Sequence, residues 1–77
     1  MKQFTIHIGS FADIRDFVAL AIAQPFEVLV SCGDQLVNAK SLMAMFSLNY
    51  RRPLQVNVMC DDESYARFTT AAAKFIA

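Results

Sequence analysis

Residues 37–48 read VNAKSLMAMFSL, a stretch that passes from an extended segment into a helix. Ser41 is suited to cap that helix, because its side-chain oxygen can accept hydrogen bonds from free backbone N–H groups of the first turn. The residues after it, LMAMF, contain no β-branched side chain, which favours a short helix over residues 42–46. Asn49 is placed to end the helix, since asparagine tolerates the left-handed conformation that often follows one.

The residues on the N-terminal side of this stretch predict a β-hairpin. Residues 26–30, FEVLV, are rich in strand-forming side chains, and Gly33-Asp34 is a fair signal for a hairpin turn. Residues 35–39 then form a short return strand. Pro25 separates the hairpin from the segment before it, because the residue preceding a proline avoids the helical region.

Closer to the N-terminus, the sequence predicts a half-buried strand and a helix. Phe4, Ile6 and Ile8 alternate with polar residues, as in a strand with one buried face. Ser10 can cap the helix that follows. The apolar stripe of that helix consists of Ile14, Phe17, Val18, Ala21 and Ile22.

The C-terminal part again has a strand pattern followed by a helix pattern. The alternating apolar residues of this strand are Leu54, Val56, Val58 and Cys60. Residues 61–63 are acidic, which suits the first turn of a helix because that turn carries partial positive charge. The stripe of the last helix consists of Tyr65, Phe68, Ala72, Phe75 and Ile76.

The predicted element order is therefore β-α-β-β-α-β-α within a single domain, residues 1–77. Two of the strands have one polar face each, which favours antiparallel pairing in a sheet that is packed on one side only. The sequence predicts an α+β sandwich with one layer of sheet and one of helices.

The composition excludes several classes of protein. Apolar residues make up 56% of the chain, above the usual ~45–50%, which excludes a disordered tail. Seven Lys and Arg residues balance seven Asp and Glu residues, so no net positive field favours nucleic-acid binding. No apolar run is long enough to cross a bilayer. We therefore expect no membrane insertion and a cytoplasmic location.

Metal and cofactor chemistry is also not expected. His7 is the only histidine, and the sequence has no cluster of cysteine and histidine that could hold a metal. We predict that His7 is an exposed strand residue. Because charged residues are only 18% of the chain, some large apolar side chains must be exposed. We expect them to form a patch that contacts a partner or a second copy of the chain.

The block Asn38-Ala39-Lys40-Ser41-Leu42-Met43 resembles HPr, the histidine-containing phosphocarrier of the bacterial phosphoenolpyruvate-dependent sugar phosphotransferase system. The element order and the acidic turn before the last helix fit the same family. The resemblance implies an open-faced β-sandwich, with a four-stranded antiparallel sheet and three helices on one face. It also implies a protein that is not an enzyme. In the family's sheet order, Cys32 and Cys60 lie at opposite ends of antiparallel strands, so we predict no disulfide.

The chain departs from the family at the phosphoacceptor. In the family, a histidine at the start of the first helix carries the phosphoryl group, within a Gly-Leu/Ile-His-x-Arg-Pro-Ala motif. The matching stretch here, residues 11–17, reads FADIRDF, with Arg15 at the arginine, Asp13 at the histidine and Asp16 at the proline. A neutral imidazole is a good nucleophile near pH 7, whereas carboxylate phosphorylation generally needs a metal and further groups. The ordinary phosphocarrier step is therefore expected to be lost.

Each residue of this site has more than one interpretation. Asp13 is a solvated helix N-terminal acid, a mimic of the phosphorylated state for a partner, or an acyl-phosphate acceptor. Arg15 is a phosphate-facing residue or a surface cation. Ser41 is a helix cap, and the resemblance makes it also a candidate for regulatory phosphorylation.

The short helix offers a candidate partner surface. In the family, the matching surface binds enzyme I and the sugar-specific subunits, and flexible methionine suits a surface with several partners. Leu42, Met43 and Phe46 are therefore either partner-binding or core residues, while Met45 and Leu48 are expected in the core.

We accordingly expect an HPr-like docking or regulatory protein that does not carry phosphate. The residues expected to bind the partner are Asp13, Arg15, Leu42, Met43 and Phe46. Two alternatives stay open: a phosphoacceptor regulated at Ser41, and an HPr fold recruited to self-association as a homodimer or to an unrelated partner.

Overall fold

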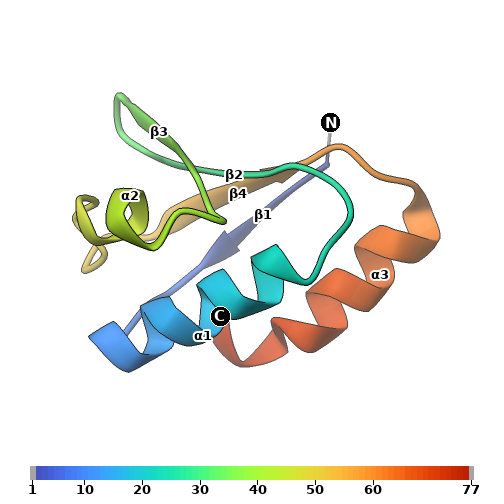
Figure 1. The fold of residues 1–77 in the computed structure, drawn as a ribbon, viewed down its shortest axis with the longest axis horizontal. Coiled ribbons are helices and arrows are strands. Elements are labelled where there is room, and N and C mark those ends of the chain that lie inside the picture. The colour runs from blue at the N-terminus through green and yellow to red at the C-terminus, as the bar shows by residue number, and fades with distance from the viewer. Residues whose placement is uncertain (1, 77) are drawn as a thin grey trace.

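The computed structural model describes residues 2–76, which form four strands and three α-helices in the predicted order. The strands are β1 (Lys2–Ile6), β2 (Val28–Cys32), β3 (Gln35–Asn38) and β4 (Leu54–Val58). The helices are α1 (Phe11–Ile22), α2 (Leu42–Phe46) and α3 (Asp62–Ala71), followed by the short 3₁₀ turn η1 (Ala73–Phe75). The predicted fold class is confirmed (Figure 1).

The strands form one sheet in the order β1-β4-β2-β3, and every neighbouring pair is antiparallel. The register places Phe4 of β1 and Val30 of β2 on either side of Val56 in β4. The β2–β3 hairpin turns at Gly33, which has a φ of 60°. A left-handed residue suits a two-residue hairpin turn, so the predicted turn signal is confirmed.

The core lies between the sheet and the helices. In Figure 1, α1 and α3 run beneath the sheet, and α2 lies near β3 and α1. The ring of Phe17 on α1 meets those of Phe68 and Phe75 at centroid separations of 6.1 and 5.6 Å. Met45 and Leu48 are buried, as predicted.

Some boundaries differ from the sequence predictions. β2 begins at Val28, because Phe26 leaves the sheet and packs its ring edge-on against Phe68 at 5.8 Å. Asn49 has no left-handed conformation, and α2 ends at Phe46. Immediately after it, the Ser47 hydroxyl donates to the carbonyl of Ala44 at 2.6 Å.

One member of the predicted stripe on α1 is not in the core. Ile22 is 59% exposed, whereas Ile14, Phe17 and Val18 are buried. At about 100° per residue, Ile22 lies roughly 80° around the helix from Ile14, at the border of the stripe. The prediction that Ile22 is buried was therefore wrong.

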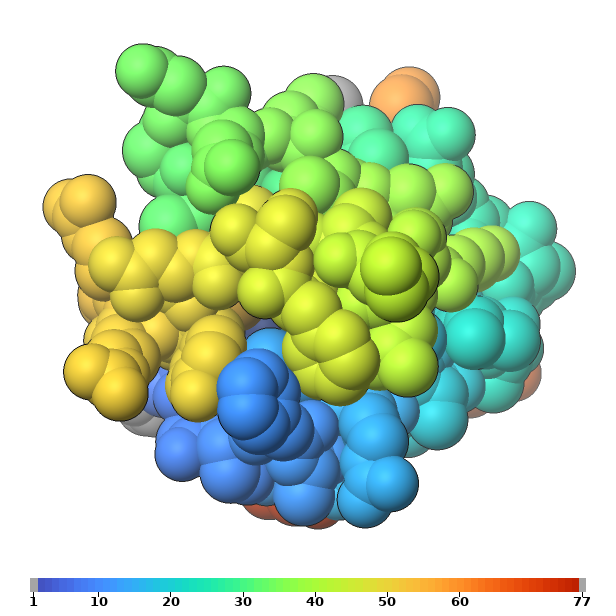
Figure 2. Space-filling view, turned by 60° about the vertical axis from the view of Figure 1, so that its left-hand side comes forward, coloured from blue at the N-terminus to red at the C-terminus, as the bar shows by residue number. Residues whose placement is uncertain are grey.

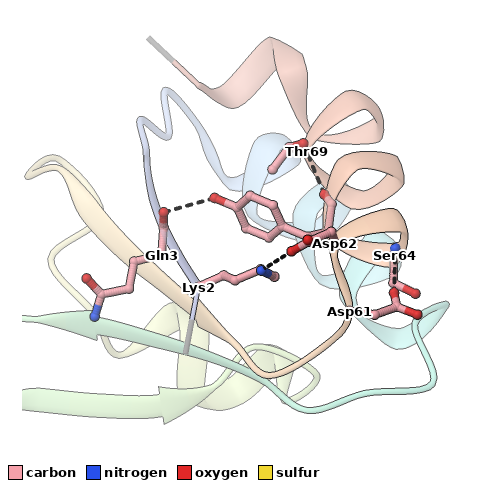
Figure 3. A network of polar contacts seen from close by, with 7 residues as sticks. Lys2, Gln3, Asp61, Asp62, Ser64 and Thr69 are labelled. Carbon is pink, nitrogen blue, oxygen red and sulfur yellow. Dashed lines mark hydrogen bonds and ion pairs between the residues drawn. The ribbon is translucent and has the colours of Figure 1, made fainter.

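The C-terminal segment covers the outer edge of β1. The hydroxyl of Tyr65 on α3 donates to the carbonyl of Gln3 at 2.9 Å, and the backbone N–H of His7 donates to the carbonyl of Phe75 at 2.7 Å. Lys2 forms an ion pair with Asp62 (Figure 3). His7 is exposed as predicted, but it lies one residue beyond β1, so the prediction that it is a strand residue was wrong.

The two thiols lie apart in the fold. Cys32 ends β2 and Cys60 follows β4, and both are free cysteines, as predicted. Burial is the main cause that raises the pKa of the Cys60 thiol above its ordinary value. Among residues 2–76, no helix has the length and hydropathy needed to cross a membrane.

Candidate docking surface

The start of α1 is built by a reciprocal pair of hydrogen bonds. Ser10 is the N-cap, and its hydroxyl accepts from the backbone N–H of Asp13 at 3.3 Å. The Asp13 carboxylate turns back and accepts from the backbone N–H of Gly9 at 3.1 Å. This arrangement closely resembles a capping box, in which two free donors at a helix start are satisfied together. Asp13 is thus the third residue of α1, and one of its carboxylate oxygens is occupied by the backbone.

The start of α2 is held in a similar way. Ser41 is the N-cap, and its hydroxyl accepts from the backbone N–H of Ala44 at 3.3 Å. The neighbouring Lys40 is half-buried, and its ammonium donates to the carbonyl of Gln24, beyond the end of α1, at 2.8 Å. A cation is favourable near a helix C-terminus, so this contact links the beginning of α2 to the end of α1.

Three rings gather between the start of α1 and the end of α2. Phe11 meets Phe46 at a centroid separation of 5.4 Å in an edge-on arrangement, and it meets Tyr50 at 5.5 Å. Such pairs contribute about 0.5–1.5 kcal/mol beyond the area that they bury. Even so, Phe11 is 60% exposed and Phe46 is 38% exposed. We call Phe11, Phe46 and Tyr50 the aromatic cluster.

A shallow hollow of about 580 Å³ lies against the aromatic cluster. It is lined by Phe11, Ala12 and Arg15 from α1 and by Phe46 from α2. Figure 2 shows this face, with the start of α1 in blue beside α2 in yellow-green and the loop after it in yellow-orange. Among the described residues, no acidic side chain lines the hollow.

The structure brings some of the predicted partner-binding residues together. Arg15 and Phe46 share the hollow, although they lie on different helices. Leu42 and Met43 are exposed on α2, and Met43 is 82% exposed. Asp13 does not line the hollow. Within residues 2–76, no three His, Cys, Asp or Glu side chains are grouped so that they could hold a metal ion.

Sequence reasoning did not select Phe11 or Tyr50. Their contact joins the start of α1 to a loop after α2, so no local periodicity predicts it. The sequence does show an aromatic residue, Phe11, at the first position of the helix that Ser10 caps. That signal does not show what the ring contacts.

Comparison with known proteins identifies the family. A family model described as the PTS HPr component phosphorylation site matches residues 14–77. The chain belongs to the HPr family. Proteins of this family are phosphocarriers of the phosphotransferase system and interact with its proteins. The match to the HPr model begins at Ile14, so Ser10 and Asp13 lie outside the matched segment.

A solved HPr structure supports the same assignment. The crystal structure of HPr-C-His from Thermoanaerobacter tengcongensis is 26% identical to this chain, with a TM-score of 0.77. The match covers 99% of this chain and 91% of that chain. A search of curated protein sequences finds no match. The HPr fold therefore extends over nearly all of this chain.

Proposed function

We propose that this HPr-family chain is a docking or regulatory protein of the phosphotransferase system that does not carry phosphate on a histidine. Its partner-binding face comprises Asp13, Arg15, Leu42, Met43 and Phe46. The observation that carries the proposal is the hollow shared by α1 and α2, which Arg15 and Phe46 both line. The exposed side chains of this partner-binding face can contact another protein.

Asp13, which stands at the position of the family's histidine in the motif, also has a structural role. Its carboxylate accepts from the backbone N–H of Gly9, and it stabilises the start of α1. A Cβ on residue 9 would lie 3.3 Å from that carboxylate, so Gly9 leaves room for this contact. The only histidine, His7, lies before the helix. Arg15 is then left to bind a partner instead of a phosphoryl group.

A binding experiment with matched variants tests the docking role. Titration calorimetry is run against enzyme I and the sugar-specific subunits of the source organism. Arg15→Ala should weaken binding about tenfold, a loss of ~1.4 kcal/mol. Arg67→Ala is the control, because Arg67 is paired with Glu63 on α3, and it should bind like the unaltered protein. Absence of binding to every component would remove the docking role.

A phosphoryl-transfer experiment tests the non-carrier role. The protein is mixed with phosphoenolpyruvate and enzyme I, and its intact mass is read at neutral pH. We expect no mass increase. Phosphate located on Asp13 or His7 by fragmentation would contradict the proposal and restore a carrier function.

Regulation at Ser41 is a second candidate, favoured by the exposure of that residue at the start of α2. Incubation with ATP and an extract of the source organism should then add phosphate at Ser41. Ser47 is an exposed serine close by, and it serves as an internal control for non-specific phosphorylation. Equal labelling of both serines, or of neither, would argue against regulation at Ser41.

Self-association is the remaining alternative, and the exposed rings and methionine of the same face favour it. Sedimentation analysis separates it from docking. A stable dimer that Phe46→Ser dissociates would support a homodimer, whereas a monomer at all concentrations would exclude one.

A further inference from the structure

The two edges of the sheet differ in how their backbone groups are used. β1 and β3 are the edge strands. The edge of β1 is covered, because the carbonyl of Gln3 accepts from the hydroxyl of Tyr65 on α3. β3 lies at the opposite edge, and the β2–β3 hairpin projects from the body of the molecule at the upper left of both views (Figure 1, Figure 2).

One residue of β3 directs both of its backbone groups outward. The N–H of Ala39 donates to the carbonyl of Val28 at 2.9 Å. In an antiparallel pair, residues that exchange hydrogen bonds alternate with residues that do not. The register then places Gln35 and Val37 in bonded pairs with β2 and directs the N–H and carbonyl of Leu36 away from it. Neither group of Leu36 bonds to other backbone among residues 2–76.

The free part of this edge is short and uncharged. It ends on one side at the hairpin turn and on the other at Asn38, whose carbonyl accepts from the N–H of Ser41 at 3.0 Å as the chain enters α2. The strand itself reads QLVN, with no charged residue and no proline. Exposed edges of natural sheets are usually protected by lysine, proline, a bulge or a covering segment. The sequence of β3 provides neither charge nor proline to keep another strand away.

The side chain of Leu36 is also exposed without a role inside the chain. On the face of the sheet that the helices leave open, the register aligns Thr5, Gln55, Ser31 and Leu36 in one row across the four strands. The first three are polar, whereas Leu36 is a leucine that is 61% exposed. Apolar surface and unbonded backbone thus occur at the same residue, and the pairing of one further strand removes both from water.

We propose that β3 pairs antiparallel with β3 of a second copy of this chain, about a two-fold axis at Leu36. Leu36 then donates its N–H to the carbonyl of Leu36 in the second copy and accepts the equivalent bond in return. The two leucine side chains lie directly opposite each other, where Cβ atoms are about 4.5–5.5 Å apart. The interface uses none of the residues of the proposed partner-binding face, so the inference does not depend on the docking function.

A second copy matches this edge in length, side chain and charge. Each copy presents the same short segment between its turn and α2, and the exposed leucine meets an identical apolar side chain. In the two-fold register, Asp34 of one copy faces Asn38 of the other. The two Asp34 residues then lie roughly 13 Å apart along the strands. This separation exceeds the Debye length of about 8 Å at physiological ionic strength, so the repulsion between them is weak.

The strength of the dimer follows from the small size of the interface. The paired segment has four residues, and the area that it buries is below the roughly 1,200–2,000 Å² of stable complexes. We therefore expect a dissociation constant on the order of 0.1–1 mM.

NMR spectra of the whole protein test this pairing over a range of concentration from about 0.05 to about 2 mM, which spans that constant. The ¹⁵N amide signals of residues 35–38 should shift as the concentration rises. In a mixture of ¹³C-labelled and unlabelled protein, an intermolecular nuclear Overhauser effect should join the methyl groups of Leu36 in the two copies.

A pair of lysine variants tests the position of the axis. Leu36→Lys places two like charges directly opposite each other and should abolish the concentration-dependent shifts. Thr5→Lys is the matched control, because it adds the same charge to the same row of the sheet on the other edge strand. It should leave the shifts unchanged. Both positions are exposed, so both variants should unfold in urea close to the unaltered protein.

The outcomes also separate this dimer from one formed through Phe46. Phe46→Ser should leave the shifts of residues 35–38 unchanged. The inference is overturned if those shifts are absent up to the highest concentration, persist in Leu36→Lys or are lost in Phe46→Ser. Shifts of the same residues that appear only when enzyme I is added would assign the edge to another protein and would also overturn it. The concentration series contains this chain alone, so its failure leaves the docking function intact.

Discussion

Polar and aromatic side chains are paired and buried to different extents at the two ends of the molecule. Where α3 meets β1, Lys2 is paired with Asp62 and the Tyr65 hydroxyl donates to the carbonyl of Gln3 (Figure 3). Where α1 meets α2, Arg15 forms no ion pair with any other residue of the 2–76 segment, and the Phe11 ring is mostly in solvent. We call these the closed end and the open end.

The difference indicates where stability and binding reside. A group that is satisfied within its own chain contributes to the free energy of unfolding, and its loss leaves a partner unpaired. An exposed group with no contact within the chain contributes little to folding. Substitutions at the closed end should therefore change stability, and substitutions at the open end should change binding.

The largest expected effect compares two phenylalanines. Phe68→Ala should lower the free energy of unfolding by about 3–5 kcal/mol, because the ring is fully buried and meets Phe4, Phe17 and Phe26. Phe11→Ala should lower it by only about 1–2 kcal/mol, because its ring is mostly exposed but still meets the other two rings of the aromatic cluster. Urea denaturation followed by circular dichroism measures both. Equal destabilisation by the two substitutions would show that Phe11 belongs to the core.

A smaller effect is expected from Asp13, which belongs structurally to the helix start although it lies at the open end. Asp13→Ala should lower the free energy of unfolding by about 1 kcal/mol, because the backbone N–H of Gly9 loses its acceptor. Asp13→Asn keeps an oxygen that can accept this bond, and it should retain most of the stability. If Asp13→Asn removes partner binding while stability is retained, Asp13 acts through its charge and not only through the helix start.

Removal of one hydroxyl at the closed end should have a still smaller effect. Tyr65→Phe deletes the donor to the carbonyl of Gln3 and should lower the free energy of unfolding by ~0.5–1 kcal/mol. Amide hydrogen exchange should become faster in β1 and unchanged in β2. Unchanged exchange in β1 would mean that the Tyr65 hydroxyl does not stabilise this edge strand.

The smallest effect is a pH dependence at the start of α3. Hydrogen bonds from the side chain and the backbone N–H of Ser64 hold the pKa of Asp61 below its ordinary value of 3.8. Because the folded pKa is depressed, the stabilisation is complete above 3.8 and is lost as pH falls through the folded pKa.

Asp61→Asn is the matched variant for this prediction, since asparagine also caps helices. Urea midpoints are compared from about pH 6 to about pH 2. At the highest pH of this range, the unaltered protein should be slightly more stable to urea than Asp61→Asn. This difference in stability should disappear at the lowest pH. A stability advantage of the unaltered protein that grows as the pH falls would contradict the prediction.

Much of the fold was predictable because it depends on local patterns. The helix over residues 42–46 begins at Ser41 as predicted, since capping needs only a serine oxygen and nearby N–H groups. The boundary of β2 was less predictable. Phe26 has strand propensity, but its ring packs against Phe68, a residue far along the chain, and this contact outweighs the local preference.

The candidate site was predictable only in part. Arg15 and Phe46 were selected through the family resemblance, and the fold brings them to one hollow. The direction of the Asp13 carboxylate depends on the orientation of the backbone N–H of Gly9. That orientation cannot be predicted from the sequence. Phe11 was missed because its role depends on contacts with α2 and the loop after it.

The covered edge of β1 has a consequence for the order of events during synthesis. In the sheet of residues 2–76, β1 is an edge strand paired with β4. The carbonyl of Gln3 at its outer edge accepts from the Tyr65 hydroxyl, and the backbone N–H of His7, just beyond the strand, donates to the carbonyl of Phe75. Contacts so distant in sequence form late, because a long loop must close first. As the chain leaves the ribosome, α1 and the β2–β3 hairpin can form early. The N-terminal strand must wait, with Phe4 and Ile6 uncovered, until nearly the whole of this sequence has emerged.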